Sequence, residues 1–345
     1  MSKPILEVKD FCVDFWVDGT WYPAAINMNF TLEPGRVLAI VGESGSGKSV
    51  TSLAIMGLHN RKVAKISGSV MIESHDGPVD IVTASDAQLR SLRGRDMAMI
   101  FQDPMTSLHP YYSIGDQLGE AYKTHNAGGN KAALARAIEM LDLVGIPEPQ
   151  RRVKEFPHQF SGGMRQRAMI AMALMNNPTL LIADEPTTAL DVTVQAQILS
   201  LLNDLQKEFN MAVILITHDL GIVAQVSDRV QVMYAGNIVE SGSVDDIYYR
   251  PLAPYTIGLL SSIPSVGARS ADRLYAIPGQ PPSLINLPTG CPFRPRCEFA
   301  SKVPGDRCAT EYPELREEQP AHSARCHLDL QLRLNGLSAV KGGAQ

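Results

Sequence analysis

Short runs of apolar residues recur along the chain, and each ends at a polar or glycine-rich turn. The most compact runs are Val37–Val41, Met97–Phe101, Leu180–Asp184 and Val213–Thr217. Stretches with helical spacing separate these runs, an alternation typical of an α/β fold with a largely parallel sheet. Because ligands of such sheets bind outside the carboxyl ends of the strands, the residues directly after these runs are the first candidates for a functional site.

Between Gln102 and about residue 175 the pattern becomes helical. One predicted helix has an apolar face made of Leu134, Ile138, Leu141 and Val144. The loop Asn126-Ala-Gly-Gly-Asn130 separates it from the helix before. We therefore predict a helical subdomain over about residues 103–175, inserted into the α/β core.

Composition is that of a folded globular protein. The chain has 345 residues, of which 45% are hydrophobic and 19% charged, and a net charge of −5. This balance does not indicate a nucleic-acid-coating surface. The N-terminus does not resemble a signal peptide, and the apolar stretch at 168–183 is too short to span a bilayer. We expect any membrane role to depend on partner proteins.

A phosphate-binding loop directly follows the strand Val37–Val41. The segment Gly42-Glu43-Ser44-Gly45-Ser46-Gly47-Lys48-Ser49-Val50 fits the pattern G-x-x-x-x-G-K-[ST]. The glycines let successive backbone N–H groups surround phosphates, Lys48 reaches the outer phosphates, and the Ser49 hydroxyl ligates Mg²⁺. A chance glycine-rich turn is the alternative, but the preceding strand and the following helix favour ATP binding.

Polar side chains suited to hydrolysis stand at the ends of three other strands. Asp184 and Glu185 end an apolar run; the first suits the Mg²⁺ shell and the second can act as general base toward water. Gln102 can contact both Mg²⁺ and this water, and His218 can reach the γ-phosphate. Each alone has a structural alternative, such as a solvated acidic turn. Their shared position at one sheet edge favours the catalytic interpretation.

A second predicted anion site has the sequence Ser161-Gly162-Gly163 at the start of a helix. Ser161 can cap this helix, and the two glycines leave backbone N–H groups open to an anion. A simple helix N-terminus would explain the serine but not the paired glycines.

After about residue 251 the composition shifts to Pro, Gly, Cys and Arg, which predicts a separate small C-terminal extension over residues 256–345. It contains four of the five cysteines, Cys291, Cys297, Cys308 and Cys326. Their spacing matches no standard ferredoxin or zinc-finger pattern, so a [4Fe–4S] cluster and zinc both stay open for a metal site at about 278–328. Unligated thiols and disulfides are the alternatives.

Six features follow one another along the chain: the phosphate loop, Gln102, Ser161-Gly162-Gly163, Asp184-Glu185, Ala189-Leu190-Asp191 and His218. This order resembles the nucleotide-binding domain of ABC transporters, a P-loop NTPase fold, which we expect over residues 1–255. The resemblance narrows to the dipeptide/oligopeptide permease ATPases on four tracts: Gly42–Val50, Phe101–Ser107, Asp184–Asp191 and Val232–Gly236. Phe160, Met164 and His109 depart from the usual pattern without removing a catalytic residue.

The resemblance implies that two such domains sandwich two ATP molecules head to tail. Ser161-Gly162-Gly163 would then contact the nucleotide of a facing subunit, and Asp191 would lie near the dimer seam and help to place the water. The family also stacks an aromatic side chain on adenine. We expect this to be Phe15, with Trp16 and Tyr22 as competitors and a core role as the alternative.

The tract Gly290-Cys-Pro-Phe-Arg-Pro-Arg-Cys297 resembles the tail of the same permease ATPases, in which such cysteines hold [4Fe–4S]. The resemblance thus favours a [4Fe–4S] cluster. We expect a structural rather than a redox role, because a Pro- and Arg-rich segment with little apolar periodicity needs a staple.

The family resemblance predicts the ATP-hydrolysing subunit of a binding-protein-dependent importer of dipeptides or oligopeptides. Its partners would be a second ATPase (a copy or a paralogue), two membrane permeases, and a periplasmic or lipid-anchored solute-binding protein, with no nucleic acid. The chain would then lie on the cytoplasmic face of a bacterial inner membrane. Alternatives are a soluble ABC ATPase of translation or DNA repair, an exporter motor, and import of a nickel complex or a sugar conjugate.

Overall fold

Parallel strands form the centre of the molecule. The computed structural model describes residues 3–188, 190–262 and 277–333, and its larger sheet has eight strands. Their spatial order is β11 (Leu315–Gln319), β12 (His322–Arg325), β10 (Asn237–Ser243), β9 (Arg229–Tyr234), β3 (Val37–Val41), β8 (Ala212–Thr217), β7 (Leu180–Asp184) and β6 (Met97–Ile100). All four strands predicted from apolar runs are therefore confirmed, two of them with identical bounds and two within one residue.

Strands β6, β7, β8, β3 and β9 are parallel. The first four have continuous apolar runs because both faces of the sheet are covered there, whereas Gln231 interrupts β9. Along β7, Leu181 and Ala183 pack into one hydrophobic cluster, with the helical subdomain. Leu180 and Ile182 pack into the other, against a second sheet. The alternation places an apolar residue in a core at every position, which explains why no polar residue interrupts β7 before its end.

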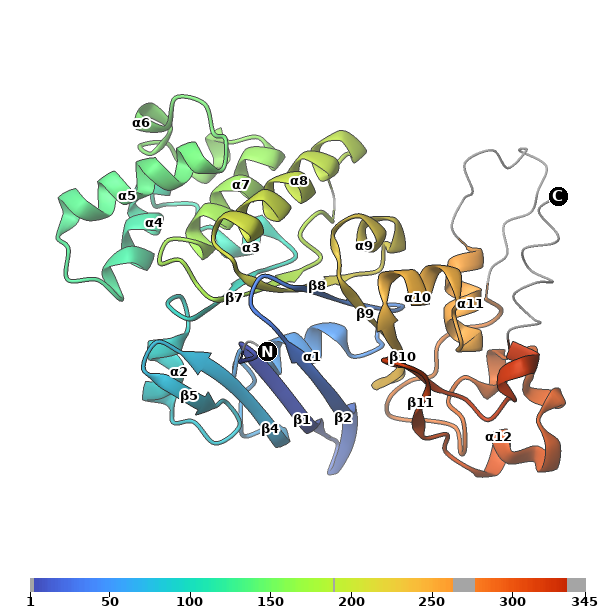
Figure 1. The fold of residues 1–345 in the computed structure, drawn as a ribbon. Helices are drawn as coiled ribbons and strands as arrows, with labels where there is room; N and C mark the ends of the chain where they lie inside the picture. The colour runs from blue at the N-terminus through green and yellow to red at the C-terminus, as the bar shows by residue number, and fades with distance from the viewer. Residues whose placement is uncertain (1–2, 189, 263–276, 334–345) are drawn as a thin grey trace.

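The second sheet is antiparallel and was not predicted from the sequence. Its strands, in spatial order, are β2 (Thr20–Leu32), β1 (Leu6–Val17), β4 (Ala64–Ser74) and β5 (Gly77–Asp80). Figure 1 shows it below the parallel strands, on the opposite side from most helices. It contributes buried Leu6, Phe11 and Val70 to the shared core.

Five α-helices occupy the range in which the sequence predicts a helical subdomain. They are α3 (Pro104–Ser107), α4 (Ile114–Lys123), α5 (Asn130–Leu143), α6 (Pro149–Arg152) and α7 (Gly162–Ala173). The predicted apolar face of α5 is wrong at Leu134, which is 45% exposed. The buried stripe instead runs along Ala133, Ala137, Met140 and Leu141. Leu134 lies beside Ala133 near the start of the helix, outside this stripe.

The remaining α-helices are α1 (Lys48–Ile55), α2 (Asp86–Leu92), α8 (Val192–Glu208), α9 (Leu220–Val226), α10 (Val244–Tyr249), α11 (Pro254–Ser261) and α12 (Arg307–Thr310). Within the described ranges, no helix has the length and apolarity needed to cross a membrane.

The C-terminal extension is joined to the core, which corrects the expectation of a separate unit. Its hairpin β11–β12 continues the large sheet, because Glu240 of β10 pairs in register with Ala324 of β12. A buried contact strengthens this junction: His322 Nε2 lies 2.8 Å from Glu240 Oε1, and both side chains are fully buried. Residues 263–276 and 334–345 of the predicted extension lie outside the described residues.

Candidate functional site

The phosphate loop begins where β3 ends and leads directly into α1. Gly47 has a φ of 102°, and a Cβ at this position would lie 2.4 Å from the Ala24 carbonyl oxygen, so only glycine fits. The Lys48 side chain is buried and folds back over the loop, where its Nζ donates to the carbonyl oxygens of Gly42 at 2.7 Å and Glu43 at 2.9 Å. The loop is thus compact, with its cation held at the centre.

Two of the three predicted Mg²⁺ ligands, Ser49 and Asp184, are in direct contact, while the third, Gln102, bonds Glu185. The Ser49 hydroxyl donates to Asp184 Oδ1 at 3.2 Å and so links the start of α1 to the end of β7. Burial raises the pKa of Asp184, while the Ser49 hydrogen bond opposes this shift. Burial also lowers the pKa of Lys48, against the attraction of Glu185 and Asp184. A hydroxyl and a carboxylate are hard oxygen donors, the type that suits Mg²⁺.

Glu185 lies at the centre of the predicted catalytic group. Gln102 Nε2 donates to Glu185 Oε2 at 3.0 Å, and His218 Nδ1 lies 3.1 Å from Glu185 Oε1. The strand register explains this meeting: Ile100 pairs with Ala183, and Asp184 pairs with Ile216, so the residues that follow these strands meet at one edge. Gln102, Glu185 and His218 thus form one hydrogen-bonded group.

Glu185 is held ionised and in a fixed orientation. Burial alone would raise its pKa, but hydrogen bonds from His218 and Thr188 outweigh burial and bring the pKa below its usual range. The Thr188 hydroxyl donates to Glu185 Oε2 at 2.9 Å. The Glu185 backbone has a φ of 47°, and its N–H donates to the Ile216 carbonyl at 2.9 Å, which turns the side chain away from the direction of Asp184. An ionised, oriented carboxylate can accept a proton from water.

Ser161 caps α7 as predicted, accepting a hydrogen bond from the Met164 N–H at 3.3 Å. The neighbouring glycines lie against the segment that follows Asp184 and Glu185 rather than against the chain's own phosphate loop. A Cβ on Gly163 would lie 3.0 Å from Val194 Cγ1, and one on Gly162 would lie 3.9 Å from Leu190. Asp191 caps the adjacent α8 by accepting from the Val194 N–H at 2.9 Å. Ala189, in the same tract, lies outside the described residues.

The predicted adenine partner lies in the antiparallel sheet. Phe15 on β1 is half-buried, packs against the core, and meets the His59 ring edge-on at 5.1 Å. Trp16 and Trp21 are more exposed and pair with each other at 5.2 Å. Tyr22 is the register partner of Phe15. These aromatic side chains lie in one hairpin, so the choice of Phe15 stays a prediction.

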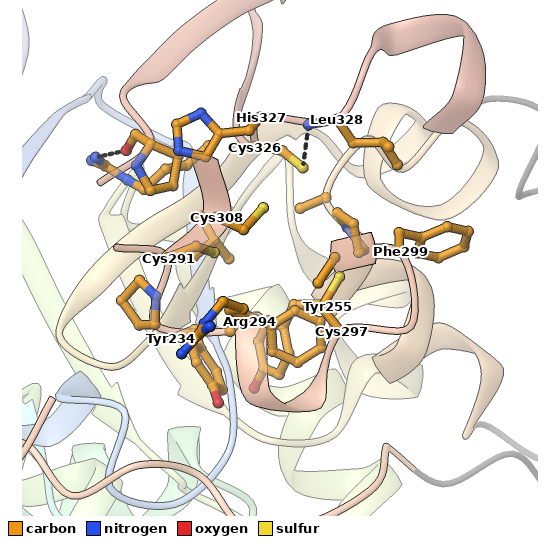
Figure 2. A pocket seen from close by; sticks show the side chains of 18 of the residues that line it. Tyr234, Tyr255, Cys291, Arg294, Cys297, Phe299, Cys308, Cys326, His327 and Leu328 are labelled. Atoms are coloured by element: carbon orange, nitrogen blue, oxygen red, sulfur yellow. Dashed lines mark hydrogen bonds between the residues drawn. The ribbon is translucent and has the colours of Figure 1, made fainter. Parts of the chain in front are cut away.

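The four C-terminal cysteines line one pocket. Figure 2 shows Cys291, Cys297, Cys308 and Cys326 around the same hollow, and all are free thiols. Burial raises the pKa of Cys291 to about 11 and that of Cys297 to about 12. Within the described part of the chain, however, no three Cys, His, Asp or Glu side chains are grouped closely enough to hold one metal ion.

Two residues near the site were missed by the sequence analysis. Thr188 bonds the predicted base, and its signal was its position three residues after Glu185, in a tract used only for the family resemblance. Arg296 contacts the phosphate loop through Glu43 from a distant segment, and no local pattern marks it. Glu43 therefore has two partners: its side chain bonds Arg296, and its backbone carbonyl accepts from Lys48.

Comparisons with known proteins agree with this geometry. A family model described as ABC transporter matches residues 26–188, and one described as oligopeptide/dipeptide transporter, C-terminal region, matches residues 239–303. Among solved structures, a dimeric post-hydrolysis state of the ATP-binding cassette MJ0796 bound to ADP and Pi has a TM-score of 0.61 and 27% identity, covering 69% of this chain and 98% of that one.

Curated relatives are similar over most of their length. The oligopeptide transport ATP-binding protein OppD of Haemophilus influenzae is 51% identical, covering 87% of this chain and 91% of the relative. The protein of the same name from Bacillus subtilis is 53% identical, covering 87% and 83%. With the phosphate loop and the Glu185 group in place, this chain belongs to the ATP-binding proteins of the oligopeptide/dipeptide ABC transporter family.

Proposed function

We propose that this chain is the ATP-hydrolysing subunit of a membrane importer for peptides. The observation that carries the proposal is the hydrogen-bonded group of Gln102, Glu185 and His218 beside the phosphate loop. The names of the OppD relatives, which describe oligopeptide transport, support peptides as the substrate class.

In this proposal each residue of the site has a separate task. The backbone of Gly42–Ser49 and the Lys48 side chain bind the phosphates, while Ser49 and Asp184, with Gln102, would hold Mg²⁺. The ion, when bound, neutralises charge that develops on the phosphate oxygens. Glu185 accepts a proton from the attacking water, and Gln102 and His218 keep its carboxylate oriented toward that water.

The site is completed in trans. The N-terminus of α7, formed by Ser161, Gly162 and Gly163, would donate hydrogen bonds to a phosphate of the nucleotide bound by the facing subunit. Their contacts with Leu190 and Val194 support this arrangement, because they place the helix start beside the segment that contains Asp191. Asp191 would couple the two sites across the seam, and Phe15 would stack on adenine. The companion is either a second copy or a paralogue.

The remaining partners are two permease subunits and an external binding protein, and the chain is attached to the cytoplasmic side of the membrane through the permeases. The helical subdomain, α3–α7, would transmit nucleotide-driven closure to these permeases. A soluble role in translation or DNA repair would need none of these partners.

Uptake by the purified complex in vesicles tests this function. We expect ATP-dependent accumulation of labelled oligopeptides, lost in Lys48→Ala because the phosphates lose their buried cation. Labelled nickel complexes and sugar conjugates serve as competing solutes in parallel assays. Uptake of one of these without peptide uptake would refute the substrate class. Failure of the chain to co-purify with permeases would refute the importer.

We further propose that the cysteine pocket holds a [4Fe–4S] cluster with a structural role, and zinc is the rival. Four soft sulfur donors line one hollow and match the donor set of either group. In the described residues they are not close enough together to hold one metal ion, so binding would have to draw them together. Cys291, Cys297, Cys308 and Cys326 would be the ligands, and the bound group would staple a segment that has few apolar residues of its own.

Removing one ligand tests the cluster. We expect anaerobically purified protein to be brown, with iron and sulfide in equal amounts, and Cys297→Ser to lose most of both. The control is Cys12→Ser, because Cys12 lies on β1, far along the chain from the pocket, and is not among its lining residues. Stoichiometric zinc without iron or sulfide would refute the cluster.

A further inference from the structure

An arginine of the C-terminal extension reaches the phosphate loop. Arg296 Nη1 lies 2.5 Å from Glu43 Oε2, and Arg296 Nη2 lies 2.9 Å from Glu43 Oε1. The contact is therefore a two-bond pair between a planar guanidinium and a carboxylate, the geometry that fixes both groups in position. It joins the second residue of the phosphate loop to a residue 253 positions later in the chain.

The Arg296 side chain is buried, and its guanidinium has several hydrogen-bond partners. The side chain is only 4% exposed, while that of Glu43 is 26% exposed. Its Nε donates to the Pro278 carbonyl at 2.9 Å, and Nη1 also lies 3.4 Å from the Tyr234 hydroxyl. With this many partners the guanidinium has little freedom to follow the loop, so the loop is anchored to the extension.

The backbone of Glu43 is held as well. Its N–H donates to the Tyr255 hydroxyl at 3.0 Å, and its carbonyl accepts from Lys48 Nζ. Tyr255 packs against Tyr234 at 4.5 Å and Phe293 at 5.4 Å between ring centroids, so the extension supports this contact too. The first residues of the phosphate loop are therefore positioned by two side chains from outside the loop, Tyr255 and Arg296.

The charge of Glu43 needs a counterion. A carboxylate in a loop that surrounds phosphates would repel the triphosphate of ATP, and this repulsion is strong where water is partly excluded. Lys48 attracts the Glu43 charge but is required for the phosphates. Arg296 offsets the Glu43 charge from the side of the extension, so Lys48 remains available to the nucleotide.

We propose that Arg296 is a positioning residue for ATP binding: it anchors and neutralises Glu43 and thereby keeps the phosphate loop in the conformation that accepts nucleotide. This role rests on the proposed use of Gly42–Ser49 as the ATP site. Arg296 acts through Glu43 and makes no contact of its own with the nucleotide.

The KM for ATP tests this role in the purified complex. We expect Arg296→Met to raise KM roughly tenfold, because only about a tenth of the free loops would then be competent to bind. The kcat at saturating ATP should stay within about twofold, since bound nucleotide itself restores the loop. Arg296→Lys, which keeps the charge but not the planar fork, should raise KM about threefold.

A double variant distinguishes this positioning role from a general loss of protein stability. In Glu43→Gln/Arg296→Met no unpaired carboxylate remains, so we expect KM to return to within about threefold of the wild-type value. The control is Arg307→Met: Arg307 adjoins Cys308 as Arg296 adjoins Cys297, but it pairs with Glu311 at the surface. Its KM should equal that of the wild type.

Lys48→Ala distinguishes the possible failures. If this variant binds a fluorescent ATP analogue as well as wild type does, the loop is not the ATP site and the proposed function fails. If Lys48→Ala loses binding while Arg296→Met and Arg296→Lys keep the wild-type KM, the positioning role is overturned. A double variant as impaired as Arg296→Met alone would also overturn it, because relief of the unpaired charge is what the proposal requires.

Discussion

Glu185→Gln is expected to lower the kcat for ATP hydrolysis by about 10²–10⁴-fold, the range that a positioned general base contributes. Glutamine has nearly the same shape as glutamate, and its side-chain amide can keep a hydrogen bond to Gln102 or His218. It cannot accept the proton of the attacking water. ATP affinity should therefore persist, and ATP should still drive two nucleotide-binding domains together without releasing them.

Two measurements on the complex check this expectation: phosphate release under saturating ATP, and the retention of labelled ATP after gel filtration. The matched control is Glu208→Gln, an exposed carboxylate at the other end of α8 from the site, which should hydrolyse ATP at the wild-type rate. Substantial ATPase activity in Glu185→Gln would remove Glu185 as the base.

Ser161→Arg is expected to lower the ATPase rate of the complex by roughly 10²-fold, comparable to the loss of one positioned donor at a developing anion. A long side chain at the start of α7 would keep the helix end away from the nucleotide of the facing subunit. The chain's own phosphate loop would be unaffected, so an isolated chain should bind a fluorescent ATP analogue with its wild-type affinity.

Ser85→Arg is the control for this substitution. Ser85 also caps a helix, accepting from the Gln88 N–H at 3.3 Å at the start of α2, so both variants lose the same kind of cap. Only Ser161→Arg should impair hydrolysis. Equal activity of the two variants would contradict a role of Ser161 in trans, and loss of ATP affinity in the isolated Ser161→Arg chain would indicate a role in the chain's own site.

The site was largely predictable because its chemistry follows local patterns. Four apolar runs predicted β3, β6, β7 and β8, and their parallel arrangement brings Gln102, Glu185 and His218 to one edge. The prediction needed only the rule that parallel strands end on the same side. The orientation of Glu185 by Thr188 depends on a turn whose backbone angles no residue pattern specified.

Long-range pairing was not predictable in the same way. The antiparallel sheet and the β11–β12 hairpin have mixed polar and apolar residues, because only part of each strand is buried, so their patterns are weak. The extension appeared separate because its attachment depends on residues far apart in the chain, through the pairing of β10 with β12 and side-chain contacts such as Arg296 with Glu43. Contacts between residues so far apart in the chain leave no periodic signal.

The central claim is that each nucleotide site is incomplete until a companion subunit supplies a helix end such as that at Ser161. The most direct test records the molar mass of the species in solution during turnover, together with the ATPase rate per chain, for the wild type and Ser161→Arg. The account predicts that hydrolysis accompanies paired nucleotide-binding domains and depends on Ser161. A chain that stays monomeric and hydrolyses ATP at full rate, with or without Ser161, would contradict it.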